Sequence, residues 1–373
     1  MKIFLVCNSL GGGGAERVHV NLANGFANRG HEVYLVADIY QKVAYPVDKK
    51  VHILPLCPEK KHKLVKWSAA IRMLRTYVKK YHADIVIGNM QLCSIISRLS
   101  TIGLGIPVVL TIHHAMESKA YKFSKLELFL DGRTPPLYAA TTVLTQADKL
   151  LLDKKYRNRK NIFVMPNPLT FVPISAVDGY LSENGRKIQK ENVILAAGRL
   201  DNWRYKGWDI LINAVKFLRP LLLEKNWKIC IAGEGTEQTM QFLESLRKDA
   251  MVEGCLEFIG YQTNMKELFQ KASIFCLSSR SEGLPMVLIE AMSQGCASVA
   301  CDNLGRTQEI ITDESMGLLF ETENIENLAQ QLTRMIRNED YRENVQRNSV
   351  ERSKYYLLEH IVDLWEDLFE KIK

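Results

Sequence analysis

Several familiar patterns are missing from this 373-residue sequence, and each absence excludes a class of protein. The eight cysteines form no Cys-x-x-Cys pair, and several lie in apolar runs, where cysteine acts as a small hydrophobic side chain. This usage fits a protein of a reducing compartment. No apolar run approaches the roughly 18 residues that a membrane-spanning helix needs. The stretch before the first glycines is too short for the core of a signal peptide. We therefore expect a cytoplasmic protein whose contact with a membrane is at most peripheral.

The complete G-x-G-x-x-G fingerprint of a dinucleotide-binding loop is also missing. The apolar run "IFLVC" is followed by "NSLGGGGAER", which predicts a strand, a glycine loop and a helix in that order. In either register the third glycine position falls on Glu16 or Arg17. A carboxylate in the first helical turn would compete with a pyrophosphate for the positive end of the helix. The pattern favours a loop that a ligand approaches closely, or a tight turn without a ligand, over a nicotinamide site.

Acidic residues are scarce in the first half of the chain. Residues 1–170 contain 25 Lys and Arg against 11 Asp and Glu, a net charge of +14, whereas the remainder contains 24 against 31, a net of −7. A basic half attracts an anionic partner. Nucleic acid, anionic lipid and a phosphorylated substrate are all compatible with this charge alone.

Apolar runs of strand length alternate with helical patterns along the chain, which is typical of parallel sheets covered by helices. A proline-rich and then polar stretch between Pro166 and Lys190 separates two such series. We predict an α/β protein with two doubly wound, Rossmann-like domains at 1–168 and 169–356. A final helix at about 357–373 has an apolar stripe and is expected to pack back on the first domain. The expected strands are "IFLVC", "EVYLVAD", "DIVIGN", "PVVLTIHH", "TTVLT" and "IFVMPN", then "VILAAGR", "KICIAGEG", "LEFIGY", "SIFCLSS", "ASVACD" and "GLLF".

The stretch "SSRSEGLPMVLIEAMSQG" carries the sharpest chemical signal. Glu282 precedes an expected helix and Glu290 lies one turn inside it. Because ligands of open parallel sheets bind beyond the carboxyl ends of the strands, both carboxylates are expected at a cleft between the two domains. They could hold two ends of a polar ligand whose phosphates lie at the amides of Gly283, Leu284 and Met286, with Pro285 in the first turn. Ordinary capping by a solvated glutamate is the alternative interpretation of these residues alone.

This segment resembles the signature of family 4 of retaining glycosyltransferases, which have the GT-B fold of two Rossmann-like domains. "GGGGAERVHVNLANGFANRGHEV" is similar to the family's N-terminal loop and helix, and "AAGRLDNWRYKGWDILINA" to the start of its second domain. "IAGEG" and "FIGY" follow in the expected order. The likeness covers most of the chain, and the combination is specific although each piece alone is not.

The resemblance implies roles for residues of the second domain. Arg199 and Lys206 would clamp the diphosphate of a sugar donor, for which a planar guanidinium and a point charge are suited. Glu282 would contact the transferred sugar near the reacting face, and Glu290 the ribose of the nucleotide. The base would meet Gly260 and Tyr261, and the donor would also touch Gly283, Leu284, Pro285 and Met286. From the residues alone, Arg199 and Lys206 are as readily two surface cations.

In the first domain, the resemblance places the glycine loop, with Gly13 and Gly14, beside the donor phosphate and the acceptor. Glu16 would cap the helix or accept a hydrogen bond from an acceptor hydroxyl. A histidine near the end of the fourth expected strand, "TIHH", would contact the donor sugar. Strand alternation turns only one of the pair toward the cleft. We favour His113 for this contact and place His114 on the acceptor side.

One departure from the family pattern and one missing motif bear on what the resemblance implies. In "DNLGRTQEII", Gly305 is followed by Arg306 where many relatives carry a Gly-Gly pair, so the identity of the sugar is left open. The sequence has no Asp-x-Asp motif, the carboxylate pair with which transferases of the other major fold hold a divalent ion on the diphosphate. We expect protein cations and helix amides to replace that ion, with no metal and no cofactor beyond the sugar nucleotide.

The segment "EKKHKLVKWSAAIRMLRTYVKK" concentrates the positive charge of the first half, from Lys60 to Lys80. Leu64, Trp67, Ile71, Leu74 and Val78 recur at helical spacing and predict an apolar stripe. The cations around the stripe form either a solvated outer face or a surface that attracts anionic lipid. No cluster of base-stacking aromatic residues accompanies them, so nucleic acid is not expected.

The resemblance implies an enzyme that transfers a hexose or N-acetylhexosamine from a nucleoside diphosphate sugar, UDP-linked, to a saccharide acceptor with retention. A lipid-linked acceptor, such as a polyprenyl-pyrophosphate saccharide used for cell-surface polysaccharide or glycan synthesis, fits the basic first half. Two alternatives remain. One is an epimerase or phosphorylase on the same scaffold, and the other is a non-catalytic module that tethers polysaccharide machinery to a membrane.

Overall fold

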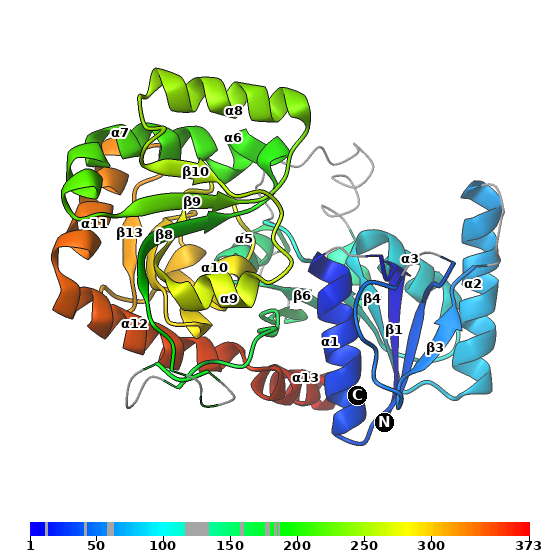
Figure 1. Cartoon of the computed structure of the whole chain (residues 1–373). Coiled ribbons are helices and arrows are strands. Elements are labelled where there is room, and N and C mark those ends of the chain that lie inside the picture. The colour runs from blue at the N-terminus through cyan, green and yellow to red at the C-terminus, as the bar shows by residue number, and fades with distance from the viewer. Residues whose placement is uncertain are drawn as a thin grey trace. The chain divides into compact units, whose positions relative to one another are not determined.

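The computed structural model describes residues 1–11, 14–40, 43–57, 63–115, 134–156, 160–175, 180–182, 185 and 187–373, with only the backbone of 63–66. The chain forms two units, each built on its own sheet (Figure 1). The first unit comprises Met1–Pro168 with Leu358–Lys373, and the second comprises Leu169–Leu357.

The first unit contains a seven-stranded sheet in the order β3-β2-β1-β4-β5-β6-β7, with every neighbouring pair parallel. The strands are β1 (Lys2–Ser9), β2 (Glu32–Asp38), β3 (His52–Pro55), β4 (Ile85–Asn89), β5 (Val108–Thr111), β6 (Ala140–Val143) and β7 (Ile162–Val164). Its helices are α1 (Gly14–Asn28), α2 (Lys63–Lys80), α3 (Met90–Ser100), α5 (Gln146–Tyr156) and α13 (Leu358–Ile372), with a 3-10 turn η1 (Pro135–Leu137). The order reverses between β1 and β4, which is where ligands of such sheets bind.

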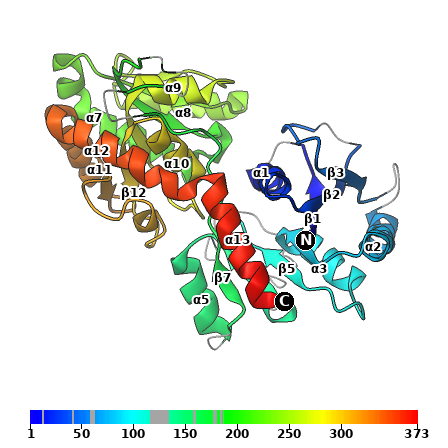
Figure 2. The same cartoon turned by 90° about the horizontal axis from the view of Figure 1, so that it is seen from below.

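Alternate residues of the strands fill two separate cores, as the pleat requires. Ile3, Leu5 and Cys7 of β1 pack with α1 and α13, whereas Phe4 and Val6 pack with α2, α3 and α5. Helix α1 accordingly lies on one face of the sheet and α2 and α3 on the other (Figure 2). The central strands are apolar on both faces because both faces are covered.

The second unit contains a six-stranded sheet in the order β10-β9-β8-β11-β12-β13, again parallel throughout. The strands are β8 (Glu191–Ala197), β9 (Lys228–Ala232), β10 (Leu256–Phe258), β11 (Ala272–Leu277), β12 (Ala297–Cys301) and β13 (Leu318–Phe320). The helices are α6 (Trp203–Lys206), α7 (Trp208–Glu224), α8 (Glu237–Asp249), α9 (Met265–Lys271), α10 (Met286–Ser293), α11 (Ile325–Arg337) and α12 (Glu339–Ser353), with 3-10 turns η2 (Leu200–Asn202), η3 (Thr307–Glu309) and η4 (Lys354–Tyr356). The reversal of order falls between β8 and β11.

Both sheets have the doubly wound parallel topology that the sequence predicts, and each expected run contains a strand. The prediction missed β3, a four-residue edge strand whose residues are exposed or half-buried and which ends at Pro55. Such a strand lacks the apolar run that marks a buried one. The strand ending before "IHH" is therefore the fifth of its sheet, not the fourth.

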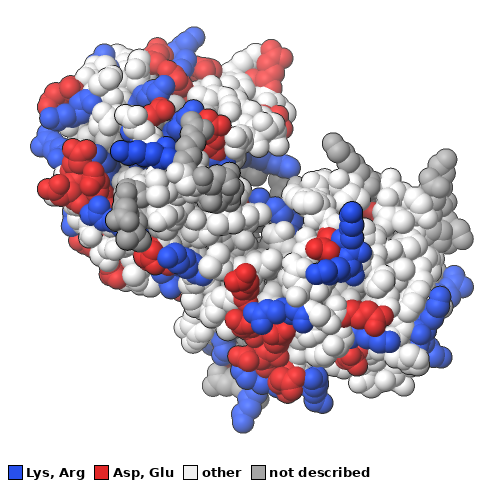
Figure 3. All heavy atoms as spheres, turned by 60° about the horizontal axis from the view of Figure 1, so that its bottom comes forward, with Lys and Arg blue, Asp and Glu red and all other residues white. Residues whose placement is uncertain are grey.

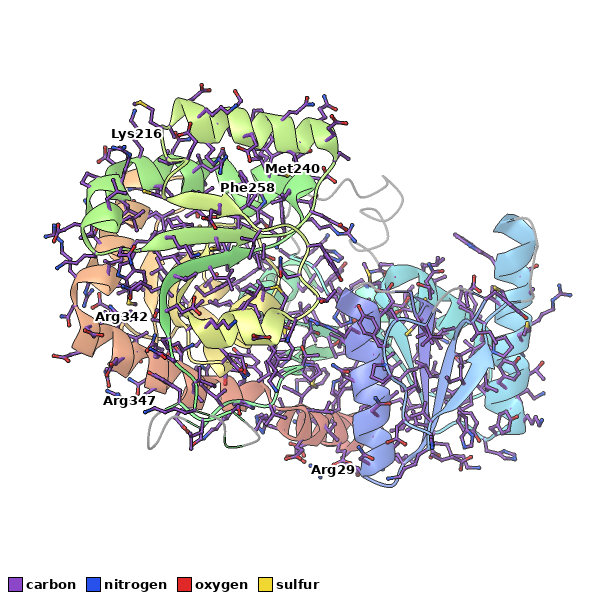
Figure 4. All side chains as sticks on the ribbon, viewed as in Figure 1. Arg29, Lys216, Met240, Phe258, Arg342 and Arg347 are labelled. Atoms are coloured by element: carbon purple, nitrogen blue, oxygen red, sulfur yellow. The ribbon has the colours of Figure 1, made fainter. Side chains whose placement is uncertain are left out.

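The last helix of the chain, α13, belongs to the first unit. Ile361, Trp365 and Leu368 are buried with α1, and a Cβ added at Gly25 of α1 would lie 2.7 Å from a methyl carbon of Val362. Arg29, which follows α1 and is labelled in Figure 4, forms ion pairs with Asp363 and Glu366. The apolar stripe of this helix therefore packs where the first domain needs a cover.

None of the described cysteines forms a disulfide and all are buried, in agreement with their interpretation as small core residues. In the part of the chain that the structure describes, no helix is both long and apolar enough to cross a bilayer.

Candidate active site

The predicted donor-site residues of the second unit follow strands on either side of the point where the order reverses. Arg199 comes directly after β8, and Glu282 lies in the loop between β11 and α10. The loops at this edge are joined by backbone bonds: Gly198 N donates to Ala232 O at 2.9 Å, and Gly233 N donates to Gly260 O at 2.9 Å. The topology therefore brings together segments that are distant in the sequence.

Lys206 is held at this edge by its own backbone. It ends α6, and Gly207 follows in the left-handed conformation with φ 66°. A Cβ at Gly207 would lie 2.1 Å from Ser278 O, so the turn packs directly against the end of β11. Ser278 Oγ also donates to Lys206 O at 2.8 Å. Only glycine tolerates both the conformation and the close approach.

The side chain of Lys206 forms an ion pair with Glu282. Its Nζ lies 2.8 Å from Glu282 Oε1, and the two side chains are only 17% and 11% exposed. A pair this sheltered is screened less by water than a surface pair. Two residues expected to hold different parts of the donor are thus paired with each other.

Helix α10 begins where the sequence predicts, at Met286 after Pro285. Within the described part of the chain, the backbone amides of Gly283, Leu284 and Met286 have no hydrogen-bond acceptor. Such amides at the first turn of a helix attract an anion. They follow Glu282 in the chain, and Glu282 is the carboxylate that pairs with Lys206.

Glu290 lies one turn into α10 and is 6% exposed. Thr170 Oγ1 donates to its Oε1 at 2.6 Å, which anchors the start of the second unit on α10. A buried carboxylate needs such donors, so the hydrogen bond stabilises the charged group. Sequence reasoning did not identify Thr170, which lies in the proline-rich stretch read as the linker.

Three other predicted donor-site residues lie on exposed loops of the same edge. Arg199 is exposed, and its carbonyl accepts from Trp208 Nε1 at 3.4 Å. Gly260 has φ 69° with no atom within 4 Å of an added Cβ, and Tyr261 is 67% exposed. These residues are available to a ligand, but among the described residues the side chains of Arg199 and Tyr261 form no hydrogen bond or ion pair with Lys206 or Glu282.

An arginine that the sequence analysis did not single out is the most extensively bonded side chain of this edge. Arg280, two residues before Glu282, is bidentate to Asp209 at 2.7 and 2.8 Å and to Glu323 at 2.5 and 2.9 Å. Hydrogen bonding to the Asp209 carboxylate raises the pKa of Arg280 above its usual range. The position of Arg280 in the stretch "SSRSEG" could have drawn attention to it, but its partners Asp209 and Glu323 lie far away in the sequence.

In the first unit, His113 follows β5 and both of its ring nitrogens have partners. Nδ1 lies 3.1 Å from Asn167 Oδ1, and Nε2 lies 3.1 Å from Thr111 Oγ1. The ring packs edge-on against His19 of α1 with centroids 5.5 Å apart. Burial lowers the pKa of His113 to about 4 and that of His19 to about 3, so both imidazoles are neutral at physiological pH.

The remaining predicted residues of the first unit are placed only in part. Gly14 begins α1 and Glu16 lies in its first turn, whereas Gly13 falls outside the described residues. His114 is half-buried next to His113. The first unit therefore has the start of α1 after β1, and after β5 a histidine that packs against His19 of α1.

The basic helix α2 differs from its prediction in one respect. Leu74 and Val78 are buried and Ile71 packs on the same core, but Trp67 is 47% exposed. Arg75 donates to Ser100 O and Ile102 O, so this cation fixes the end of α3. Lys60 and Lys61 lie outside the described residues, as do the side chains of Lys63 and Lys66.

Comparison with known proteins matches both halves of the chain. Residues 12–170 match the family model described as Glycosyltransferase Family 4, and residues 181–352 match Glycosyl transferases group 1. The chain is 28% identical over 382 residues to a Campylobacter jejuni enzyme named GalNAc-α-(1→4)-GalNAc-α-(1→3)-diNAcBac-PP-undecaprenol α-1,4-N-acetyl-D-galactosaminyltransferase, covering 100% of this chain and 99% of that one.

Two further proteins extend the comparison. The Escherichia coli UDP-Gal:α-D-GlcNAc-diphosphoundecaprenol α-1,3-galactosyltransferase is 25% identical over 283 residues, covering 73% of this chain and 71% of the relative. Among solved structures, sucrose-phosphate synthase from Thermosynechococcus elongatus superposes with a TM-score of 0.80 at 17% identity, covering 100% and 98% of the two chains. With two parallel α/β units and both family models matched, the chain is a glycosyltransferase of family 4 with the GT-B fold.

Proposed function

We propose that this glycosyltransferase moves a hexose or N-acetylhexosamine from a UDP-sugar to a saccharide carried on a polyprenyl diphosphate, with retention of anomeric configuration. The observation that carries the donor half is the grouping at the second unit's strand reversal: Lys206, Glu282 and the free amides that begin α10. The names of two relatives support the proposed lipid-linked acceptor, because both name undecaprenyl-diphosphate-linked sugars.

The proposed roles follow from the chemistry of each group. Negative charge grows on the diphosphate as the sugar departs, and Lys206, Arg199 and the α10 amides are cationic or proton-donating groups suited to stabilise it. Glu290, an acceptor-only group one turn deeper, suits the ribose hydroxyls. Glu282 would face the sugar once the diphosphate takes over Lys206. No metal is assigned, because these groups supply the positive charge themselves.

The first unit is proposed to contribute His113 to the contact with the donor sugar, and Glu16 and His114 to the acceptor side. His113 is neutral, so it would not attract a competing phosphate, and it would bind a sugar hydroxyl only by exchanging its bond to Asn167 or to Thr111. Glu16, at the start of α1, would accept from an acceptor hydroxyl. His114 is kept as the acceptor-side neighbour.

A peripheral association of the first unit with anionic lipid is the remaining part of the proposal. The exposed cations and Trp67 of α2 suit a lipid surface, at on the order of 1 kcal/mol per basic residue near it. On the face drawn in Figure 3, positive and negative side chains are interleaved, so α2 and not the whole surface is the proposed contact. Sedimentation with anionic vesicles, lost on Lys79→Gln/Lys80→Gln, would support it.

The proposal is tested first by a thermal-shift panel of UDP-, GDP- and ADP-sugars, since a ligand that binds only the folded state raises the melting point. The sugar that shifts it is then supplied with undecaprenyl-diphosphate-linked saccharides, and the product and free UDP are quantified. We expect transfer that Lys206→Ala abolishes and that Arg334→Lys, an exposed pair with Glu314, leaves intact. UDP release or epimer formation without an acceptor would favour the epimerase or phosphorylase alternative, and lipid binding without turnover would favour the tethering module.

A further inference from the structure

We propose that Arg280 is a positioning residue that fixes Lys206 opposite Glu282, in the arrangement that receives the donor diphosphate. This inference rests on the proposed function, because it assigns Arg280 a task within the same site. Arg280 itself is not expected to touch the donor.

The first observation is that every N–H of the Arg280 side chain is used. Nε donates to Glu323, Nη1 to Asp209 and to Arg204 O, and Nη2 to Asp209 and Glu323, with donor–acceptor distances of 2.5 to 2.9 Å. A guanidinium has five such protons in a rigid planar fork. Since none remains for a ligand, the side chain is suited to hold protein groups and not to bind substrate.

The second observation is which groups it holds. Arg204 O and Asp209 lie on either side of Lys206, in α6 and in the first turn of α7. The backbone amide of Arg280 adds a bond to Tyr205 O at 2.9 Å. One residue therefore grips the chain immediately before Lys206 and shortly after it.

The third observation concerns the other end of the same loop. Glu282 lies two residues beyond Arg280, and Ser278, two residues before it, donates to Lys206 O. The loop from 278 to 282 thus carries both the clamp on the Lys206 backbone and the carboxylate that pairs with the Lys206 ammonium. Side chains whose backbones are joined this way keep their separation, which is the requirement of a preorganised site.

Glu323, which accepts two hydrogen bonds from Arg280, has a strained backbone conformation. It is a non-glycine residue with φ 67°, a strained conformation that persists only where surrounding contacts over-determine it. Its carboxylate and that of Asp209 share one guanidinium, so Arg280 also neutralises negative charge near the place where a diphosphate would enter. Lysine at this position would keep the charge but could not bridge both carboxylates and a carbonyl in a plane.

The experiment is a double-mutant cycle read as UDP affinity by titration calorimetry, with the unchanged protein, Arg280→Lys, Lys206→Ala and the double variant. If Arg280 acts through Lys206, Arg280→Lys weakens UDP binding about tenfold alone but less than about twofold when Lys206 is already alanine. Melting points of all variants separate this effect from a loss of stability. A purely structural role would give the same loss in both backgrounds.

Two matched variants complete the design. Arg334→Lys breaks another arginine–carboxylate pair of the same unit, 2.7 Å long and exposed, and is expected to leave UDP affinity unchanged. Asp209→Asn keeps the guanidinium, and is expected to show the same non-additivity if Arg280→Lys does not fold. Equal losses in both backgrounds, or no loss in a folded Arg280→Lys protein, overturn the inference. No UDP binding by the unchanged protein overturns the proposed function, and this inference with it.

Discussion

At the scale of single residues, Lys206 and Glu282 neutralise each other's charge in an ion pair. The two side chains are sheltered and 2.8 Å apart, so under the proposed function an entering diphosphate would take the ammonium from the carboxylate. The same event would release Glu282 toward the sugar. Binding of the nucleotide and readiness of the sugar contact are therefore coupled through one hydrogen bond.

This coupling predicts an unusual variant. Glu282→Gln removes the competing negative charge, so we expect UDP to bind more tightly, by about 1 kcal/mol or roughly fivefold, while sugar transfer slows. Calorimetry with UDP and initial rates of transfer measure the two effects. Glu314→Gln, which removes a carboxylate paired with Arg334 on the surface, is the control and should change neither. Weaker UDP binding by Glu282→Gln would show that the carboxylate does not compete for Lys206.

The buried histidines of the first unit predict a pH dependence of stability. Burial holds the pKa of His113 at about 4 and that of His19 at about 3, against about 6.5 in an unfolded chain. Between these values the unfolded state binds protons that the folded state does not, so the free energy of unfolding falls as the pH drops from about 6.5 toward about 4. Above about pH 6.5 the contribution is complete.

Melting points measured between about pH 7.5 and about pH 5 test this expectation. We predict that His113→Gln makes the melting point less dependent on pH in this range, because one of the two titrating groups is gone. His52→Gln, which removes an exposed histidine of the same unit, should leave the slope as it is. An unchanged slope in His113→Gln would contradict the burial argument.

Sequence reasoning reached the residue types of the donor site but not their pairing. Glu282 and Glu290 flank the start of a helix, and that pattern is visible in sixteen or so letters. The contact of Lys206 with Glu282 and the grip of Arg280 on Asp209 join residues more than 70 positions apart. Such bonds depend on which strands are neighbours, and charge and spacing along the chain do not specify them.

At the scale of elements, the turn between α6 and α7 determines where the cation lies. Gly207 lets α6 end and α7 begin within one residue, against the carbonyl at the end of β11. The loop after β11 then returns past the same turn toward α10. Placement of the site is thus a consequence of helix and strand ends packed directly on each other.

Alanine at Gly207 is expected to be strongly destabilising, by roughly 2 kcal/mol or more, because the conformation is left-handed and the new Cβ would meet Ser278 O. Gly260→Ala is the matched comparison: its φ is 69°, but an added Cβ has open space, so only about 1 kcal/mol is expected. Urea unfolding measures both. Equal costs at the two positions would show that the close approach at Gly207 is relaxed in solution.

Buried elements were predictable, and exposed ones were less so. Continuous apolar runs mark the central strands because those strands are covered on both faces. The edge strand β3 has no such run, and the exposed Trp67 has the spacing of a core residue without being one. The spacing of apolar residues along a helix predicts which side chains can face the sheet. Whether a given side chain is buried depends on how far the packed neighbours extend along the helix.

At the scale of the whole molecule, the chain completes its first unit with its last helix. Trp365 is 2% exposed and packs edge-on against Phe26 with centroids 6.3 Å apart. The core beneath α1 therefore includes residues from both ends of the sequence. The second unit has a separate core and carries Lys206, Glu282 and Glu290 of the proposed donor site.

This organisation predicts separable stabilities. Trp365→Ala should lower the stability of the first unit by about 3–5 kcal/mol, whereas UDP affinity, a property of the second unit, is retained. Trp67→Ala removes an exposed tryptophan of the same unit and should cost much less. Circular dichroism during urea unfolding, with and without UDP, resolves the two effects. Loss of UDP binding in a Trp365→Ala protein whose second unit is folded would contradict the separation.

The central claim is that the second unit seats the donor diphosphate between Lys206 and the first turn of α10. A crystal structure of the protein with UDP tests it most directly. We predict diphosphate oxygens within hydrogen-bonding distance of Lys206 Nζ and the amides of 283–286, and ribose hydroxyls on Glu290. A diphosphate bound elsewhere, with the Lys206–Glu282 pair still closed, would contradict the account.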